Sequence, residues 1–523
     1  MTDAHPRPLS PCCYAASSPG LASLPSRIGP SPHRAAAPSC RAAPSLRRAA
    51  SSPLAALLLL TLVACAGPQQ TPTGGPTGAP PPTPPLPVAS AAARSLGPLP
   101  PGQTQRPAIL IRGGDLWTAD SAGRVLAQHD LLIVEGRIAA IGKDLKAPAG
   151  AITLDATGQV VTPGLVDLHS HLGVYAAPSS IASADGNEMT QPLTPMVRAI
   201  DAFDPEDPAI ARALGGGVTT ALVLPGSGNV MGGLGVPVKL RGATVADMTI
   251  ADAPLQMKMA MGENPKRNHG GKGRMPSTRM GHAWLMRERF AAARAQLQRA
   301  TGGGGAEAGQ AGAAAGDRSL DTLVALLRGE VRLHVHCYEV HDIETLLRVT
   351  AEYGVPVAAI HHALEAWKVP GLLQARGIGV ATFADLWGFK MEAQDASVRG
   401  PAILAAAGVA VAIKSDHPVL DARDLMFEAA KSHHHGLPAQ AALAAVTRVP
   451  AELMGLGARI GSLEVGKQAD VAIWPSPPLT SVAVRPSHVL VDGAVWVEPS
   501  RNHQQAYAGP ARAEGGSPCG CGL

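Results

Sequence analysis

The sequence predicts an α/β protein: a (β/α)8 TIM-like barrel with a small β-sandwich domain built from both flanks of the barrel. Three observations predict it. Apolar, strand-like runs alternate with amphipathic helical stretches between residues 160 and 455, as in a parallel α/β sheet. Six or more such units in about 300 residues favour a closed barrel over an open sheet. Short strands bounded by turn residues lie immediately before and after this region.

The two flanks differ in composition from the segments outside them. Strands are expected at 108–114, at 130–142 around the turn Glu135-Gly136, and again at 469–474 and 488–497. The predicted organisation is a signal region at 1–65, a Pro/Gly-rich disordered linker at 66–106, β-sandwich parts at 107–160 and 458–498, the barrel at 161–457 and a disordered tail at 499–523.

The barrel elements follow from the apolar runs and their periodicity. After a first strand that ends near His171, strands are expected at 217–224, 255–261, 331–337, 355–362, 379–383 and 409–416. Amphipathic spacing predicts helices at 279–299, 343–353 and 438–447.

The N-terminal region carries a candidate export signal. An apolar run at 54–63 follows Arg47 and Arg48 and is too short to span a bilayer. It ends in Leu62-Val63-Ala64-Cys65, which resembles the lipobox of bacterial lipoproteins. The resemblance implies lipidation of Cys65 and an exported protein of the cell envelope, on the periplasmic face of a bacterial membrane, that touches the membrane only through its anchor. The long stretch before the run favours a true translation start downstream of Met1.

Charge and cysteine usage exclude some classes of protein. Residues 1–64 hold six arginines and one acidic residue, a charge of +5, so the net charge of +4 leaves about −1 for the rest of the chain. No basic surface for nucleic acid is therefore expected. Of the seven cysteines, Cys337 alone falls in a predicted barrel strand, so the fold is not expected to depend on disulfides.

Metal-ligand side chains lie where the predicted barrel strands end. His169 and His171 are two residues apart on an extended run, so both imidazoles face the same side and can share a metal ion. Functional residues of a parallel barrel gather at the carboxyl ends of its strands. Those ends also hold His334, His336, His361, His362, Glu263 and Asp416.

Several motifs then resemble one family. Residues 163–171 read Pro-Gly-Leu-Val-Asp-x-His-x-His, and residues 461–470 read Gly-Ser-Leu-Glu-Val-Gly-Lys-Gln-Ala-Asp. Residues 411–418 are similar to the family's motif for the last barrel strand, and residues 365–368 follow a strand-end histidine as they do in that family. Over about 107–498 the chain resembles metal-dependent amidohydrolases of the imidazolonepropionase-like group.

The resemblance implies a ligand set. His169, His171 and Asp416 would bind one metal. As further metal ligands, His336 is preferred over His334, and His362 is preferred over His361. We expect His361 to pack outward or to bond a helix. At the strand predicted for 255–261, relatives use either a glutamate or a carboxylated lysine as a metal ligand. Glu263 is preferred here, and Lys258 is the alternative. One or two divalent ions are expected, zinc first, with manganese or iron as alternatives.

The implied chemistry is hydrolysis by a metal-activated water. Asp416 would accept and return a proton, and His362 would stabilise charge on the attacked carbonyl. Tyr338 is a candidate donor to the same oxygen, with packing as the alternative. Lys414 would either neutralise a carboxylate below the metals or be turned outward by a bulge. Candidate substrate-binding residues are Gly226 and Asn229 in a Gly-rich turn and the cations Lys266 and Arg267.

The predicted function is therefore hydrolysis of carbon–nitrogen bonds: an amide, a cyclic amide or a peptide. The alternatives within the superfamily are an Xaa-Pro-type or other dipeptidase and a deaminase. The alternative from a different class is a non-catalytic metal-binding envelope lipoprotein. The expected partner is a small-molecule or dipeptide substrate, and a homo-oligomer is compatible with the sequence.

Overall fold

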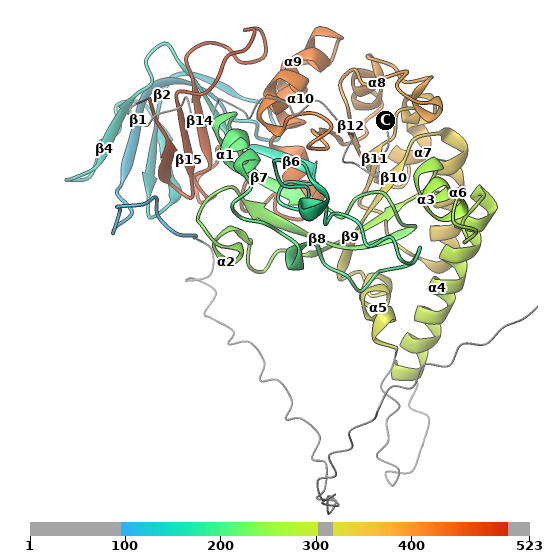
Figure 1. The fold of residues 1–523 in the computed structure, drawn as a ribbon. Coiled ribbons are helices and arrows are strands. Elements are labelled where there is room, and N and C mark those ends of the chain that lie inside the picture. The colour runs from blue at the N-terminus through green and yellow to red at the C-terminus, as the bar shows by residue number, and fades with distance from the viewer. Residues whose placement is uncertain (1–95, 302–316, 500–523) are drawn as a thin grey trace, which may run out of the picture. The chain divides into compact units, whose positions relative to one another are not determined.

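The computed structural model describes residues 96–301 and 317–499, in which a small β domain adjoins a larger α/β barrel (Figure 1). The predicted signal region with Cys65, most of the linker and almost all of the tail lie outside the described residues, so those expectations stay predictions. Within the described ranges, no helix combines the length and apolar character needed to cross a membrane.

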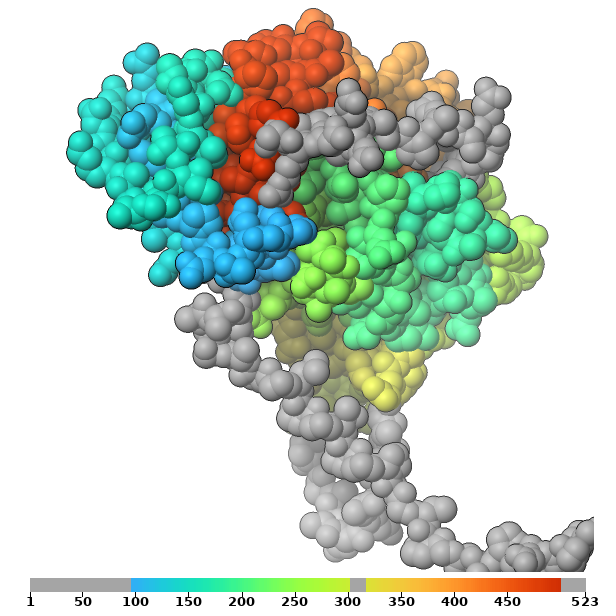
Figure 2. All heavy atoms as spheres, turned by 60° about the vertical axis from the view of Figure 1, so that its left-hand side comes forward, coloured from blue at the N-terminus to red at the C-terminus, as the bar shows by residue number. Residues whose placement is uncertain are grey.

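The small domain is one eight-stranded sheet to which both flanks of the barrel contribute. Antiparallel pairing of β5 with β14 sets Val161 opposite Ile473 and joins the flanks. Figure 2 shows the red C-terminal segment between the blue and teal N-terminal strands and the green part of the barrel. The sheet order is β16-β15-β14-β5-β1-β2-β3, with β4 beside β1. The strands are β1 Ile109–Trp117, β2 Val125–Val134, β3 Arg137–Gly142, β4 Ile152–Asp155, β5 Val160–Pro163, β14 Val471–Trp474, β15 His488–Val491 and β16 Ala494–Val497.

The barrel sheet confirms the predicted fold class, with one strand that the sequence analysis missed. Strand β8 is antiparallel to both β7 and β9, whereas the other neighbouring pairs are parallel. Its sequence contains three glycines and a proline, which are poor strand formers, so no apolar run marks it. The strands are β6 Leu165–Ser170, β7 Val218–Val223, β8 Met231–Lys239, β9 Leu255–Ala260, β10 Val331–Cys337, β11 Ala359–His362, β12 Gly379–Thr382 and β13 Val411–Ile413.

The first and last barrel strands are joined where the predicted ligands lie. The backbone N–H of Asp416 donates to the carbonyl of His169 over 2.8 Å, and the N–H of His171 donates to the carbonyl of His417 over 3.0 Å. The buried Asp167 carboxylate accepts hydrogen bonds from the backbone and hydroxyl of Ser415. Closure of the barrel therefore brings β6 and the end of β13 together.

The helices flank the barrel strands, and those predicted at 279–299, 343–353 and 438–447 correspond to α4, α6 and α10. Helix α6 ends at Tyr353 and is followed by Gly354, whose φ of 68° is the left-handed conformation that glycine adopts readily. The α-helices are α1 Pro208–Gly215, α2 Val245–Met248, α3 Glu263–Gly270, α4 Arg279–Thr301, α5 Asp321–Leu327, α6 Val340–Tyr353, α7 Pro370–Gln374, α8 Gly400–Ala406, α9 Leu425–His434, α10 Ala439–Ala444 and α11 Arg448–Leu453. Short 3₁₀ helices cover Ile181–Ser183, Ala199–Asp201, Arg318–Leu320, Ala366–Lys368, Met391–Ala393 and Ala422–Asp424.

A buried ion cluster links the barrel to the small domain. Lys239, at the end of β8, donates to Asp470 over 3.0 Å and also pairs with Asp492. Arg241 Nε lies 2.8 Å from the second carboxylate oxygen of Asp492. Burial alone would raise the pKa of Asp492, but Lys239 and Arg241 outweigh it and hold that pKa at about 2. The two aspartates precede β14 and follow β15, so the cluster fixes both against β8.

Replacing Lys239 by methionine is expected to destabilise the protein by about 3–5 kcal/mol, because two buried carboxylates would lose their shared cation. The free energy of unfolding, measured with urea and circular dichroism, checks this. Arg287→Met is the matched control: its pair with Glu352 is partly exposed on both sides, so a loss below about 1 kcal/mol is expected. Equal losses of unfolding free energy in the two variants would contradict the conclusion that the buried cluster stabilises the protein more than an exposed ion pair does.

Candidate metal centre

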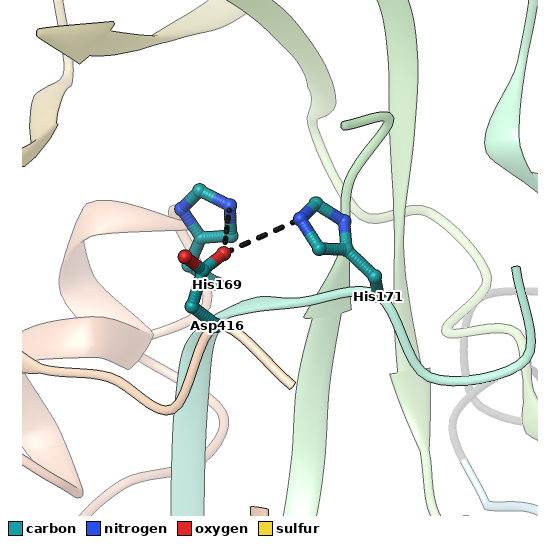
Figure 3. A group of neighbouring side chains, drawn as sticks. All are labelled: His169, His171 and Asp416. Atoms are coloured by element: carbon teal, nitrogen blue, oxygen red, sulfur yellow. Dashed lines mark ion pairs between the residues drawn. The ribbon is translucent and has the colours of Figure 1, made fainter. Parts of the chain in front are cut away.

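Three predicted ligands converge at the junction of the first and last barrel strands. His169 Nε2 and His171 Nε2 lie 3.1 Å and 3.3 Å from Asp416 Oδ1 (Figure 3). All three side chains are buried, and their ligand atoms lie within 4.8 Å of one another. Asp416 has φ 56°, an uncommon backbone conformation for a residue other than glycine, and such conformations gather at functional sites. Two imidazoles and a carboxylate around one point are a donor set suited to a divalent metal.

The Gly-rich turn after β7 orients two of the imidazoles. His171 Nδ1 donates to the carbonyl of Leu224 over 2.7 Å, which turns its Nε2 toward Asp416. His336 Nδ1 lies 2.8 Å from the hydroxyl of Ser227, a residue that the sequence analysis did not single out. No sequence signal marks Ser227, because a serine in a Gly-rich turn is ordinarily part of the turn. Hydrogen bonds of this kind fix ring orientation at metal sites.

Two more imidazoles offer nitrogen atoms at the site. Among the described residues, His336 Nε2 and His362 Nε2 are buried without a hydrogen-bond partner. Their ring centroids are 4.2 Å apart, and the His362 ring lies 5.0 Å from that of His169. Buried polar atoms are seldom left unsatisfied, so these nitrogens suit the role of metal ligands. His334 differs, because both of its nitrogens are hydrogen-bonded, to His361 and Gln256.

In the structure Lys258, the alternative ligand of the strand at 255–261, lies beside the candidate histidines, whereas the preferred Glu263 does not. Lys258 is fully buried in β9, and its Nζ lies 3.5 Å from His169 Nε2 and 3.1 Å from Ser227 Oγ. Glu263 begins α3 instead, where its carboxylate lies 3.2 Å from Lys390 Nζ and is 29% exposed. The strand ends at Ala260, so Glu263 has already left the barrel wall.

The expectation that His361 packs outward or bonds a helix is wrong. Its ring lies inside the barrel, with Nδ1 2.8 Å from His169 Nδ1 and Nε2 2.8 Å from His334 Nδ1. Strict alternation would turn His362 away from this interior. The backbone instead adopts φ 66° at His362 and φ 46° at Ala363, which breaks the alternation at the strand end. Both adjacent histidines therefore reach the site region.

Lys414 and Tyr338 lie beside the same centre. Lys414 is fully buried and faces the site, with Nζ 3.4 Å from Asp416 Oδ2 and 3.0 Å from His362 Nδ1. This placement matches the neutralising role and not the outward one. The Tyr338 ring stacks on His362 at 5.0 Å and 12°, and Lys390 Nζ lies 4.0 Å above the Tyr338 ring. Tyr338 thus positions His362, and its role as a donor to substrate stays a prediction.

Burial and charge set the protonation states that a metal ligand needs. Burial, followed by Lys258, holds the pKa of His169 well below its usual value. Burial alone would raise the pKa of Asp416, but the Lys414 ammonium above all outweighs it and keeps that pKa well below its usual range. Burial lowers the pKa of Lys414 to about 8, although Asp416 opposes the shift. Near neutral pH His169 is therefore neutral and Asp416 ionised, the forms that bind metal.

The candidate substrate-binding residues differ in how far their polar groups are engaged within the fold. The buried amide of Asn229 is engaged within the fold: Nδ2 donates to the Thr194 hydroxyl over 2.8 Å, and Oδ1 lies 2.8 Å from His269 Nε2. Its role in substrate binding stays a prediction. The backbone N–H of Gly226 donates to the Gly186 carbonyl over 2.7 Å, so it is not available to an anion. Half-buried Lys266 and exposed Arg267 lie on α3, and their binding role stays a prediction.

Comparison with known proteins identifies the family. The solved structure of an amidohydrolase from Thermotoga maritima MSB8 is 33% identical and superposes with a TM-score of 0.69, over 75% of this chain and 100% of that chain. The chain belongs to the amidohydrolase family. The model of that family matches residues 374–495 of this amidohydrolase, which include Asp416.

Curated relatives share parts of this amidohydrolase. Amidohydrolase tasK of Hapsidospora irregularis is 36% identical over 419 residues, which is 73% of this chain and 42% of that protein. A dihydroorotase of Geotalea daltonii is 50% identical over 64 residues, or 12% of this chain and 15% of that protein. This amidohydrolase therefore spans less than half the length of either curated relative.

Proposed function

We propose that this amidohydrolase is a metal-dependent hydrolase of carbon–nitrogen bonds, with an amide, cyclic amide or short peptide as substrate. The observation that carries the proposal is the convergence of His169, His171 and Asp416 within 4.8 Å of one another, all buried. Strand-end carboxylate and imidazole groups of a barrel are where such enzymes place their chemistry. A divalent cation at this point would act as a Lewis acid toward water and the substrate carbonyl.

A second ion, where one binds, has candidate ligands beside the first. Lys258 Nζ lies 3.5 Å from His169 Nε2, and His336 and His362 each present a buried Nε2 without a hydrogen-bond partner in the described residues. A carboxylated Lys258 would supply oxygen atoms between the two positions. This arrangement supports either one or two ions, with zinc as the first expectation because neutral imidazole suits it.

Asp416 is the proposed acid–base group. Its Oδ1 faces His169 and His171 at the end of β6. Its Oδ2 lies 3.4 Å from Lys414 Nζ and 3.6 Å from His362 Nδ1. The ionised carboxylate can accept a proton from an attacking water and pass it to the leaving nitrogen. Lys414 keeps Asp416 ionised between these transfers, and the ring of His362 lies where it can stabilise charge on a carbonyl oxygen.

The experiment is metal analysis of the purified protein combined with turnover of a panel of cyclic amides, linear amides, dipeptides including Xaa-Pro, and aminated heterocycles. We expect one or two divalent ions per chain and hydrolysis of at least one amide, lost on chelation and restored by zinc. Ammonia release from the heterocycles alone would replace the amide proposal with a deaminase. Stoichiometric metal without turnover of any member would favour the non-catalytic lipoprotein.

A further inference from the structure

A row of hydrogen-bonded side chains runs from the metal centre into the barrel interior. His169 Nδ1 lies 2.8 Å from His361 Nδ1, and His361 Nε2 lies 2.8 Å from His334 Nδ1. His334 Nε2 lies 2.8 Å from Gln256 Oε1. All four side chains are 0% exposed, so water does not compete for these bonds. The row joins β6, β11, β10 and β9, and its far end holds no ionisable group.

The direction of the row is set at Gln256. Its Nε2 lies 2.6 Å from the carbonyl of Pro254 and 3.1 Å from that of Met454. Carbonyl oxygens only accept, so the amide nitrogen faces them and the amide oxygen faces His334. An amide oxygen also only accepts, and His334 Nε2 must therefore carry a proton and donate it.

That one donor determines the others. A neutral imidazole protonated at one nitrogen accepts at the other, so His334 Nδ1 accepts a hydrogen bond from His361 Nε2. His361 Nδ1 then accepts from His169 Nδ1. Among the described residues, neither His334 nor His361 has a carboxylate within ion-pair distance, so a second proton on either ring would be an unpaired buried charge.

We propose that Gln256, His334 and His361 are positioning residues that hold His169 with its proton on Nδ1 and its Nε2 bare. The bare Nε2 is the atom that lies 3.1 Å from Asp416 Oδ1 and 3.5 Å from Lys258 Nζ. Gln256, at the far end of the hydrogen-bonded row, thus selects the tautomer of His169, a metal ligand three side chains away. The inference rests on the metal site of the proposed function.

The wild-type protein tests the proposal without any substitution. Chelated full-length protein labelled with ¹⁵N-histidine is measured by long-range ¹⁵N–¹H NMR, which separates the two neutral tautomers and the charged ring. We expect His334 and His361 protonated on Nε2 and His169 protonated on Nδ1. A His169 ring protonated on Nε2, or a charged His334 or His361, would overturn the proposal.

Two variants separate positioning from packing. Gln256→Met keeps the length of the side chain but removes the acceptor, and we expect zinc affinity, measured against a competing chelator, to fall about 10–100-fold. Gln256→Glu keeps an oxygen acceptor toward His334 and is expected to bind zinc far more tightly than Gln256→Met. Equal losses in both variants would overturn the proposal. If wild-type protein binds no zinc, the proposed function fails, and the tautomers of the chelated protein still decide the direction of the row.

Discussion

Asp416→Asn is expected to lower kcat by about 10²–10⁴-fold, the range in which a positioned acid–base group contributes. Asparagine keeps the shape of the side chain but cannot accept the proton of the attacking water. It also removes the negative charge that lies 3.1 Å and 3.3 Å from two histidine nitrogens, so metal content should fall as well. Steady-state kinetics on the substrate found by the panel, with metal analysis of the same preparation, measures both effects.

The control for this variant is Asp395→Asn, in an exposed carboxylate that pairs with Lys368. Its kcat and metal content are expected to match the wild type. Thermal unfolding of both variants shows whether lost activity reflects lost structure. Asp416→Asn protein that turns over at the wild-type rate would remove Asp416 from the mechanism, whatever its metal content.

Lys258→Met is expected to remove bound metal and to reduce activity by about 10²-fold or more, whereas Glu263→Gln should retain both. Lys258 is fully buried, and its Nζ lies 3.5 Å from His169 Nε2. Glu263 is partly exposed and engaged with Lys390 outside the barrel wall. Metal stoichiometry and kcat/KM of the two variants, prepared side by side, provide the measurement.

The two variants control for each other, since each removes one charged group from the segment that begins at β9. Metal loss in Glu263→Gln with retention in Lys258→Met would restore our sequence-based preference for the glutamate. Loss of metal in neither variant would place the ligands of this strand elsewhere.

The ligand-bearing strand ends could be predicted because each is marked in the sequence by an apolar run that stops at a histidine or carboxylate. His169, His171 and Asp416 were found this way, and they meet because closure of the barrel joins β6 to the end of β13. Strand β8 was missed because its glycines and proline hide the apolar pattern, although the neighbouring strands hold it in the sheet by pairing on both sides.

The differences between the expected and the observed positions of site residues have local causes. His361 was misplaced because strict alternation does not foresee the positive φ of His362 and Ala363. Glu263 was preferred because a carboxylate is a direct metal ligand and this one follows the predicted strand end at residue 261. In the structure β9 ends at Ala260 and Glu263 already belongs to the first turn of α3. The hydrogen bonds of Asn229 to Thr194 and His269 could not be predicted, because a polar turn that binds a ligand and one that holds a loop have the same composition.

The closure between Asp167 and Ser415, which are 248 residues apart in the chain, also governs when the metal centre can exist. A nascent chain holds His169 and His171 long before Asp416 has been synthesised, and contacts of such long range form late in folding. Until then the two histidines can bind an ion only loosely. The ligand set is thus complete only when the barrel has closed, and tight metal retention should report that β13 has paired with the rest of the sheet.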